Sequence, residues 1–229
     1  YAAPERRLFG LAVYKHRLDY AVAAGLLLRS VGLGADGSFG NDATLEVAVP
    51  PGAGPTEISK IAFDEQGRMV LAERPAPTGA FDFEALTPQG IGRVLRYANA
   101  AGADPNAELN WQPVPDEYAI GFPLDLRNGN GGIDIGYLYK PNGDIDLENC
   151  GGYLWSTGEQ LRKSSDASLA ARLRQSGPEN VDGVQGNGTW RIRRDDEPPL
   201  LSYFIDYDDR FDDDAARGHM GDVAIARVC

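Results

Sequence analysis

The sequence predicts an all-β chain of short antiparallel strands, and two observations favour this class. The 229 residues include 28 glycines and 15 prolines, which weaken helix interiors and mark tight turns. The apolar residues fall in short runs bounded by turn residues. None of these runs approaches the roughly 20 residues that would span a bilayer as a helix. With 42% hydrophobic residues, the chain can still bury a substantial core.

We expect the strands in four successive groups. The first group contains Leu8–Tyr14, Arg17–Ala23, Leu26–Leu33 and Thr44–Val49. The second contains Ile58–Phe63, Arg68–Ala72 and Gly92–Tyr97. The third contains Gly132–Tyr139 and Gly152–Ser156, and the fourth contains Val181–Gly183, Thr189–Arg193, Leu201–Tyr207 and Asp222–Val228. A short helix is expected from Ser165 to Arg174, with Asp166 near its start. The glycine groups 128–132 and 183–188 match no phosphate-binding motif and are expected to be tight connections.

The spacing of these groups predicts a β-propeller. The groups begin near residues 8, 58, 132 and 181, a repeat of about 50 residues with one longer interval. Four short antiparallel strands per repeat are typical of propeller blades, here 6–53, 57–118, 130–176 and 180–229. A β-sandwich is the alternative, because short strands with regular turns also suit it.

Four units make a small ring, so the chain forms either that ring or the C-terminal part of a larger one. Because an exposed edge strand tends to pair with another strand, we expect a partner chain or an unpaired edge near Leu8 or Val223.

Several segments carry a resemblance to known propellers. ISKIAFDEQGRMVLAERPAPTG, at residues 58–79, resembles the blade consensus of NHL-type and gluconolactonase-like propellers. IDIGYLYKPNGDIDLENCGGYLWSTGEQLR, VDGVQGNGTW and SYFIDYDDRFDDDAARGHMGDVAI resemble the propeller module of large secreted or envelope-attached bacterial proteins. This resemblance implies an architecture and a secreted, periplasmic or cell-surface location, and it brings no established reaction. The metal ligands of gluconolactonase-like enzymes have no matching positions here.

One acidic stretch predicts a cation site. Six carboxylates lie within the nine residues from Asp206 to Asp214, and hard oxygen ligands in a loop suit Ca²⁺. The expected ligands are Asp206, Asp208, Asp209, Asp212, Asp214 and Asp222, with His219 as a secondary candidate. A solvated acidic loop is the competing interpretation, since the spacing of a helix–loop–helix calcium site is absent.

A second group of cation ligands could form at a turn that contains Asn142, Asp144 and Asp146. Its competing interpretation is an ordinary Asn-Gly hairpin turn, which needs no cation.

The chain has two cysteines, Cys150 and Cys229, and we expect them to form a disulfide in an exported protein. Their number and spacing do not fit a structural zinc site.

These features predict a secreted or envelope-associated propeller that acts as a structural or binding module and is stabilised by Ca²⁺. The net charge of −12 argues against nucleic-acid partners and anionic membranes, so no direct membrane insertion is expected. The expected partner is another protein chain or the remaining part of a larger surface protein. Aromatic residues gather in the second half, where they pack between blades or form a sugar-binding or protein-binding surface. These are Tyr137, Tyr139, Tyr153, Trp155, Tyr203, Phe204 and Tyr207.

The alternative function is a metal-dependent hydrolase or lactonase of the gluconolactonase-like type, which would use the acidic loop and His219. The chain carries no G-x-S-x-G nucleophile motif, and we assign no catalytic residue.

Overall fold

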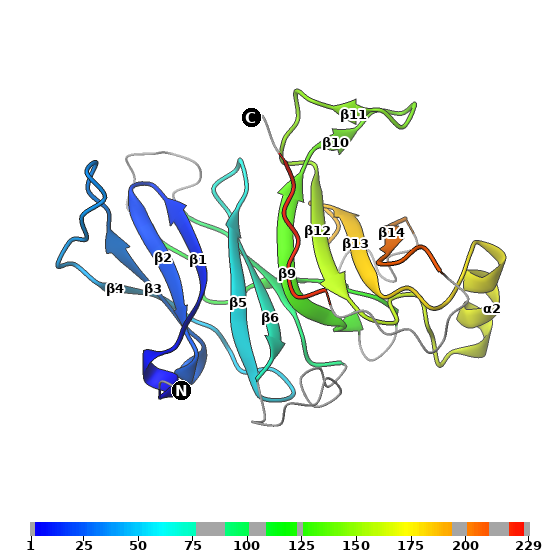
Figure 1. Cartoon of the computed structure of the whole chain (residues 1–229), viewed down its shortest axis with the longest axis horizontal. Helices are drawn as coiled ribbons and strands as arrows, with labels where there is room; N and C mark the ends of the chain where they lie inside the picture. Colours follow the sequence, from blue (N-terminus) through cyan, green and yellow to red (C-terminus); the bar gives the residue numbers. More distant parts are fainter. Residues whose placement is uncertain are drawn as a thin grey trace.

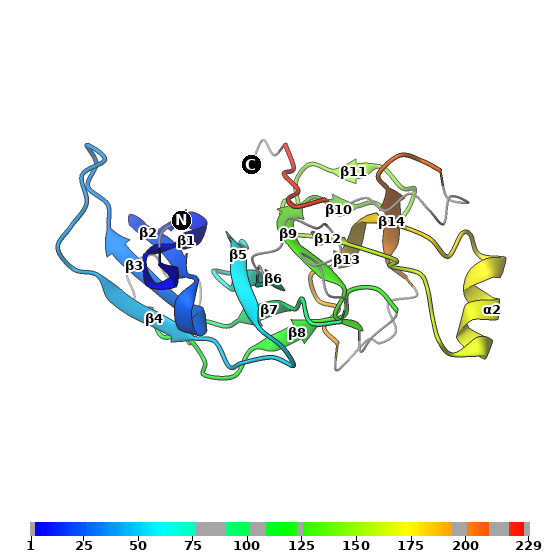
Figure 2. The same cartoon turned by 60° about the horizontal axis from the view of Figure 1, so that its bottom comes forward.

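A computed structural model describes residues 3–76, 90–100, 109–122, 126–193, 201–210 and 220–226. Within these residues the chain forms three four-stranded antiparallel sheets and one two-stranded hairpin. The sheets stand in a row in the order of the sequence, as Figures 1 and 2 show. The predicted all-β class is therefore confirmed.

Each four-stranded sheet follows the order of the chain. The first sheet contains β1 (Leu8–Tyr14), β2 (Arg17–Val22), β3 (Leu27–Gly32) and β4 (Thr44–Ala48). The second contains β5 (Thr56–Phe63), β6 (Met69–Pro75), β7 (Val94–Tyr97) and β8 (Asp116–Tyr118). The third contains β9 (Gly129–Gly136), β12 (Tyr153–Gly158), β13 (Gly183–Gly188) and β14 (Tyr203–Asp206). The hairpin of β10 (Leu138–Tyr139) and β11 (Ile145–Asp146) follows β9, and 3-10 turns form at Pro4–Arg6 and Ala24–Leu26.

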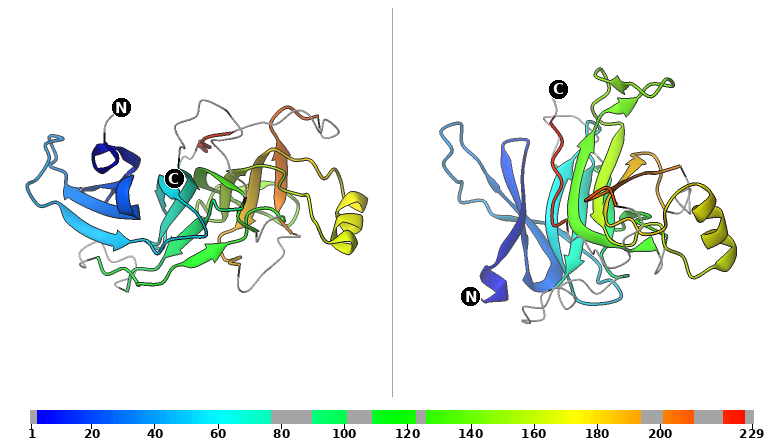
Figure 3. Two further views of the ribbon diagram at one scale, coloured as in Figure 1. Left: turned by 90° about the horizontal axis from the view of Figure 1, so that it is seen from below. Right: turned by 45° about the vertical axis from the view of Figure 1, so that its right-hand side comes forward.

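The first strands of the three sheets adjoin one another. β1 packs against β5, and β5 packs against β9. Ser59 of β5 donates its hydroxyl to the carbonyl oxygen of Gly131 on β9 at 2.7 Å, which fixes the second pair. Figure 3 shows the same row of sheets from two further sides, with α2 at its far end.

The second sheet is buried on both faces. Successive side chains of a strand point to opposite faces. Met69 and Leu71 of β6 therefore join the core shared with the first sheet, whereas Val70 and Ala72 join the core shared with the third. This double burial explains why the start of β6 is a continuous apolar run and not an alternating one.

The strands expected in the first two groups are present, with ends that differ by a few residues. The second half differs from the expectation. β13 pairs with both β12 and β14, so residues 129–206 form one sheet where we expected separate units at 130–176 and 180–229. The two glycine groups are strands and not connections, since they lie at the start of β9 and in β13.

The described residues do not form a closed ring. β1 is the edge strand of its sheet, and Val223 lies in a segment that pairs with no strand among the described residues. Among the described residues β1 pairs only with β2, so the unpaired edge expected near Leu8 is present, whereas Val223 lies in no strand.

Helix α2 (Ala167–Gln175) agrees with the expected helix. The carboxylate of Asp166 caps it by accepting hydrogen bonds from the backbone N–H groups of Ser168 and Leu169, at 2.8 and 2.9 Å. A hydrogen bond from the Ser168 hydroxyl, together with these two backbone bonds, lowers the pKa of Asp166. In the described part of the chain, no helix has the length and apolar character needed to cross a membrane.

Candidate functional site

Asp206, Asp208 and Asp209 lie at the end of β14 and in the turn that follows it. The carboxylate of Asp206 accepts a hydrogen bond from the backbone N–H of Asp182 at 2.9 Å, which ties β14 to the residue before β13. Partial burial raises the pKa of Asp206, and this hydrogen bond opposes the rise. The carboxylate of Asp208 accepts a bond from the backbone N–H of Arg210 at 3.0 Å. Asp206 and Asp208 therefore stabilise the local backbone.

Asp222 lies in the segment beside β9, where it forms an ion pair with Lys60 of β5 at 2.7 Å. Asp212, Asp214 and His219 lie outside the described residues. Among the residues that the structure describes, no group of three or more His, Cys, Asp or Glu side chains could hold a metal ion. The calcium site thus stays a prediction that depends on residues 211–219.

The second cation candidate is a hairpin turn. The Asn142 amide donates to the Asp144 carboxylate at 2.8 Å, and the Asp144 backbone N–H donates back to Asn142 Oδ1 at 3.2 Å. Gly143 between them has a φ of +89°, a conformation that favours glycine. Asp146 accepts a bond from the Asn149 amide at 2.6 Å. These contacts satisfy the polar groups locally and favour the hairpin interpretation.

Cys150 lies directly before β12, where its exposed fraction is 5%, and it carries no free thiol. Cys229 is the other cysteine of the chain and lies outside the described residues. Its bond to Cys150 therefore stays a prediction.

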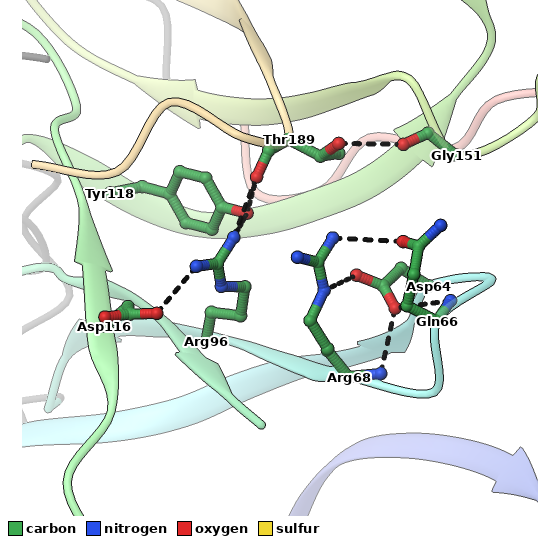
Figure 4. Close-up of polar contacts among 8 residues, drawn as sticks. All are labelled: Asp64, Gln66, Arg68, Arg96, Asp116, Tyr118, Gly151 and Thr189. Atoms are coloured by element: carbon green, nitrogen blue, oxygen red, sulfur yellow. Dashed lines mark hydrogen bonds and ion pairs between the residues drawn. The ribbon is translucent and has the colours of Figure 1, made fainter. Parts of the chain in front are cut away.

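A polar junction holds the third sheet against the second (Figure 4). Arg96 of β7 and the Tyr118 hydroxyl of β8 both donate to the carbonyl oxygen of Thr189, at 3.0 and 2.7 Å. Arg96 also pairs with Asp116 at 2.6 Å. The Thr189 hydroxyl donates to the carbonyl of Gly151 at 2.9 Å, which joins the ends of β12 and β13. This network fixes the positions of the two sheets.

The turn between β5 and β6 lies beside this junction in Figure 4. The Asp64 carboxylate accepts the backbone N–H groups of Gln66 and Arg68, at 3.0 and 2.9 Å, and pairs with the Arg68 guanidinium at 2.6 Å. Because the hydrogen-bonding groups of Asp64, Gln66 and Arg68 pair with one another, this turn stabilises the second sheet.

The buried carboxyl group of Asp19 lies between the first and second sheets. Asp19 of β2 has an exposed fraction of 0%, and neither of its carboxylate oxygens has a hydrogen-bond partner. Burial, reinforced by the nearby Glu46 carboxylate, raises the pKa of Asp19 to about 7, while Arg17 opposes this rise. Glu46 itself accepts bonds from the Ser30 hydroxyl and the Trp111 indole, at 2.5 and 3.1 Å.

The face of the third sheet that points away from the second sheet is aromatic, and we call it the third-sheet outer face. It carries Tyr153, Trp155, Val184, Tyr203 and Ile205, which strand pairing places on one side. Tyr139 and Trp190 contact Tyr153 edge to face, with ring centroids 5.2 and 6.0 Å apart. Part of the expected aromatic group is therefore brought together on one surface.

Glycines of β13 give this face its form. A Cβ on Gly186 would lie 2.7 Å from the Trp155 ring, and one on Gly188 would lie 2.6 Å from the Trp190 ring. The rings thus lie close over the strand, and large apolar side chains remain in contact with solvent. Trp190 is 55% exposed and Ile205 is 54% exposed.

Residues 220–226 run along β9 (Figure 1), and their contacts at Gly132 and Gly136 place them on the side of the third sheet that carries Trp155. The backbone N–H of Ile225 donates to the Asp134 carboxylate at 2.6 Å, and its side chain lies over Gly136. Val223 and Ile225 are half-buried, whereas residues 222, 224 and 226 are exposed. This alternation is typical of a strand with one side against a sheet.

The face of the first sheet that points away from the second sheet is aliphatic, and we call it the first-sheet outer face. Strand pairing places Leu8, Leu11, Val13, Leu18, Tyr20, Val22, Leu27, Val31 and Leu45 on it. Val13 is 61% exposed and Leu11 is 59% exposed. A cavity of about 580 Å³ lies on this face and is bordered by Arg6 and Arg29.

The sequence pattern indicates most of the aromatic residues of the third-sheet outer face but neither Trp190 nor the first-sheet outer face. One signal for the latter was available. β1 carries apolar side chains at positions of both faces, Phe9 and Ala12 on one side and Leu11 and Val13 on the other. Which of the two faces is covered depends on the neighbouring sheet.

No model of a known protein family matches the chain, and a search of curated proteins finds no significant match. A function is therefore inferred from the chemistry and geometry of the described residues.

Proposed function

We propose that the chain is a structural or binding module whose contact sites are the two outer faces. The observation that carries this proposal is the exposure of large apolar side chains at both ends of the row of sheets. Contiguous apolar patches on a soluble protein typically mark contact sites for other proteins. The partner is another protein chain or the remaining part of a larger surface protein.

We also propose that the three sheets are blades of a propeller-type array. Each is a four-stranded meander, and their first strands adjoin in chain order, as in successive blades. The resemblance of residues 58–79 to NHL-type and gluconolactonase-like blades supports the same view. In this proposal the array is open, and one or more further sheets, from the partner named above, complete it.

The same resemblance supports a secreted, periplasmic or cell-surface location, and the even number of cysteines agrees with it. We retain Ca²⁺ binding by the 206–214 stretch as part of the proposal. Nothing among the described residues favours the alternative of a metal-dependent hydrolase or lactonase.

Calcium binding is tested by thermal unfolding with Ca²⁺ and with a chelator. A cation that binds only the folded state raises the free energy of unfolding, by about 2.7 kcal/mol at 100 times its Kd. We expect the chelator to lower Tm, and the double variant D212N/D214N to lose this response. A D144N/D146N control should keep it. An unchanged Tm in chelator would leave a solvated acidic loop.

The contact faces are tested by photo-crosslinking in the cells that produce the protein. A photo-reactive residue replaces Val13 on the first-sheet outer face or Ile205 on the third-sheet outer face. The control replaces Asp144, an exposed residue of the β10–β11 turn. We expect a specific protein adduct from at least one face and none from the control. If neither face gives more adduct than the control, the proposed function is wrong.

A further inference from the structure

The outer faces of the first and third sheets are rich in apolar side chains, like the sheet faces that this chain buries at its internal junctions. The two internal junctions cover both faces of the second sheet with apolar side chains of its neighbours. The first and third sheets each use one face in this way, and each leaves large apolar side chains of the other face exposed. The row of sheets therefore ends in an aliphatic face at one side and an aromatic face at the other.

The segment 220–226 continues the packing order of the first strands. β1 lies against β5, and β5 lies against β9. Residues 220–226 in turn lie against β9 on the face that carries Trp155, because the Asp222 Cα lies over Gly132 and the Ile225 side chain over Gly136. Asp222 also reaches Lys60 of β5. They occupy the place that the first strand of a fourth sheet would take. No strand in the described chain pairs with this segment, so its backbone is open to a strand from elsewhere.

The sheet that fits this place must have a free edge and an apolar face, and the first sheet has both. Among the described residues β1 pairs only with β2, so its other edge can pair with residues 220–226 of a second copy, as in strand addition. The exposed side chains of Leu11 and Val13 on the same sheet can cover the rings of Trp155 and Tyr203. One chain cannot make this contact with itself, because its second sheet stands between the two.

We propose that a second copy of this chain occupies the third-sheet outer face, with its first sheet packed there and its β1 beside residues 220–226. The proposal rests on the proposed function, because it names the partner of the same faces. Each copy carries one face of each kind, so two copies can satisfy all four faces in a closed pair of six sheets. The same contact without closure would give an open chain of copies.

The first test measures the mass of the purified protein by sedimentation velocity. Samples span about 1 to about 100 µM, so a pair with a micromolar Kd changes from mainly monomer to mainly dimer within the range. We expect a concentration-dependent species with the mass of two chains. A protein that stays a monomer over the whole range overturns the proposal.

Charged substitutions on each face then locate the contact. V13D changes an exposed side chain of the first-sheet outer face, and I205D changes one of the third-sheet outer face. Because both positions are exposed, the fold should persist. Circular dichroism and Tm measurements check this. We expect each variant alone to be a monomer. V114D is the control, at a side chain that is 76% exposed and lies outside both faces, and it should pair like the wild type.

Mixing the two variants identifies the head-to-tail arrangement. V13D retains an intact third-sheet outer face, and I205D retains an intact first-sheet outer face, so an equal mixture can form one unaltered contact. We expect a dimer of one V13D and one I205D chain, weaker than the wild-type pair because the second contact is lost. A mixture that stays monomeric, or an I205D variant that pairs normally, overturns the proposal.

The crosslinking result separates the two levels of inference. Adducts of the faces with a different protein, in a chain that stays monomeric, would leave the proposed function standing and end the self-association proposal. The absence of any adduct from either face would end both.

Discussion

Asp19 couples the fold of the first two sheets to pH. Its pKa is about 7 in the folded chain against an ordinary value of 3.8, so the folded state holds this proton more tightly than the unfolded state. The stability that this proton provides is complete below about pH 4 and is lost as the pH rises through about 7. The loss is at most about 4 kcal/mol, because one pKa unit corresponds to about 1.4 kcal/mol.

We therefore expect D19N to reduce the decrease in unfolding free energy between about pH 5 and about pH 8. Asparagine has nearly the same shape but cannot ionise, so the variant gains stability relative to the wild type at the higher pH. Urea unfolding at both pH values measures this. D36N, at an exposed turn, is the control and should keep the wild-type pH dependence. Equal slopes for D19N and the wild type would contradict the assigned role of burial.

Cys150 supplies a second prediction at the scale of a residue. A bond to Cys229 would close a loop of about 80 residues, and the chain-entropy model gives such a bond about 4 kcal/mol. We expect no reactive thiol in the denatured, unreduced chain and a lower Tm after reduction. The C150S/C229S variant should unfold like the reduced protein and show no further response to reductant. Two reactive thiols per unreduced chain would refute the disulfide and remove one support for export.

β13 is an element that ordinary strand propensity does not favour, because half of its residues are glycine. Tertiary contacts stabilise it instead. The Trp155 ring covers Gly186, and the buried side chain of Gln185 donates to the carbonyl of Ala119 at 2.9 Å. Gln185 also accepts the backbone N–H of Gly121 at 2.6 Å, so it joins the third sheet to the end of the second.

We expect G186A to destabilise the protein by about 1–3 kcal/mol, because the added methyl group would overlap the Trp155 ring. Urea unfolding measures the change. G221A is the matched control, since a Cβ at Gly221 meets no atom within 4 Å, and it should have little effect. A wild-type unfolding midpoint for G186A would mean that the ring moves without cost.

At the scale of the whole molecule, the second sheet determines stability because it contributes to both cores. Leu71 of β6 is completely buried in the core shared with the first sheet. We expect L71A to lower the free energy of unfolding by about 2–5 kcal/mol. Circular dichroism and tryptophan fluorescence should then report one shared unfolding midpoint, shifted to lower denaturant. V114A removes an exposed side chain near the same sheet and should change the unfolding free energy by less than about 0.5 kcal/mol. Separate transitions in L71A would indicate that the sheets unfold independently.

The sequence predicted the first two sheets well for a physical reason. Their strands are apolar runs bounded by turn residues, such as the turn of residues 64–67, where the Asp64 carboxylate organises the backbone. The same reading failed at residues 183–188, which look like a loop because glycine and amide side chains carry no apolar signal. Their partners, Trp155 and the backbone of residues 119–121, are distant in the sequence.

The candidate contact faces were predicted in part. The aromatic group of the second half and the strand edge near Leu8 follow from residue type and from the number of strands. The position of residues 220–226 on β9 depends on single contacts, such as the bond from Ile225 to Asp134, that no local pattern encodes.

By itself, the sequence determined the all-β class, most strands of the first two sheets, the capped helix and the acidic character of the chain, because these depend on neighbours within a few residues. Only the tertiary structure decided which apolar faces are covered. β1 and β6 both carry apolar side chains on two faces, yet β6 lies between two sheets and β1 lies at the end of the row. Burial is a property of what lies across the space from a side chain, and a strand's own sequence does not contain it.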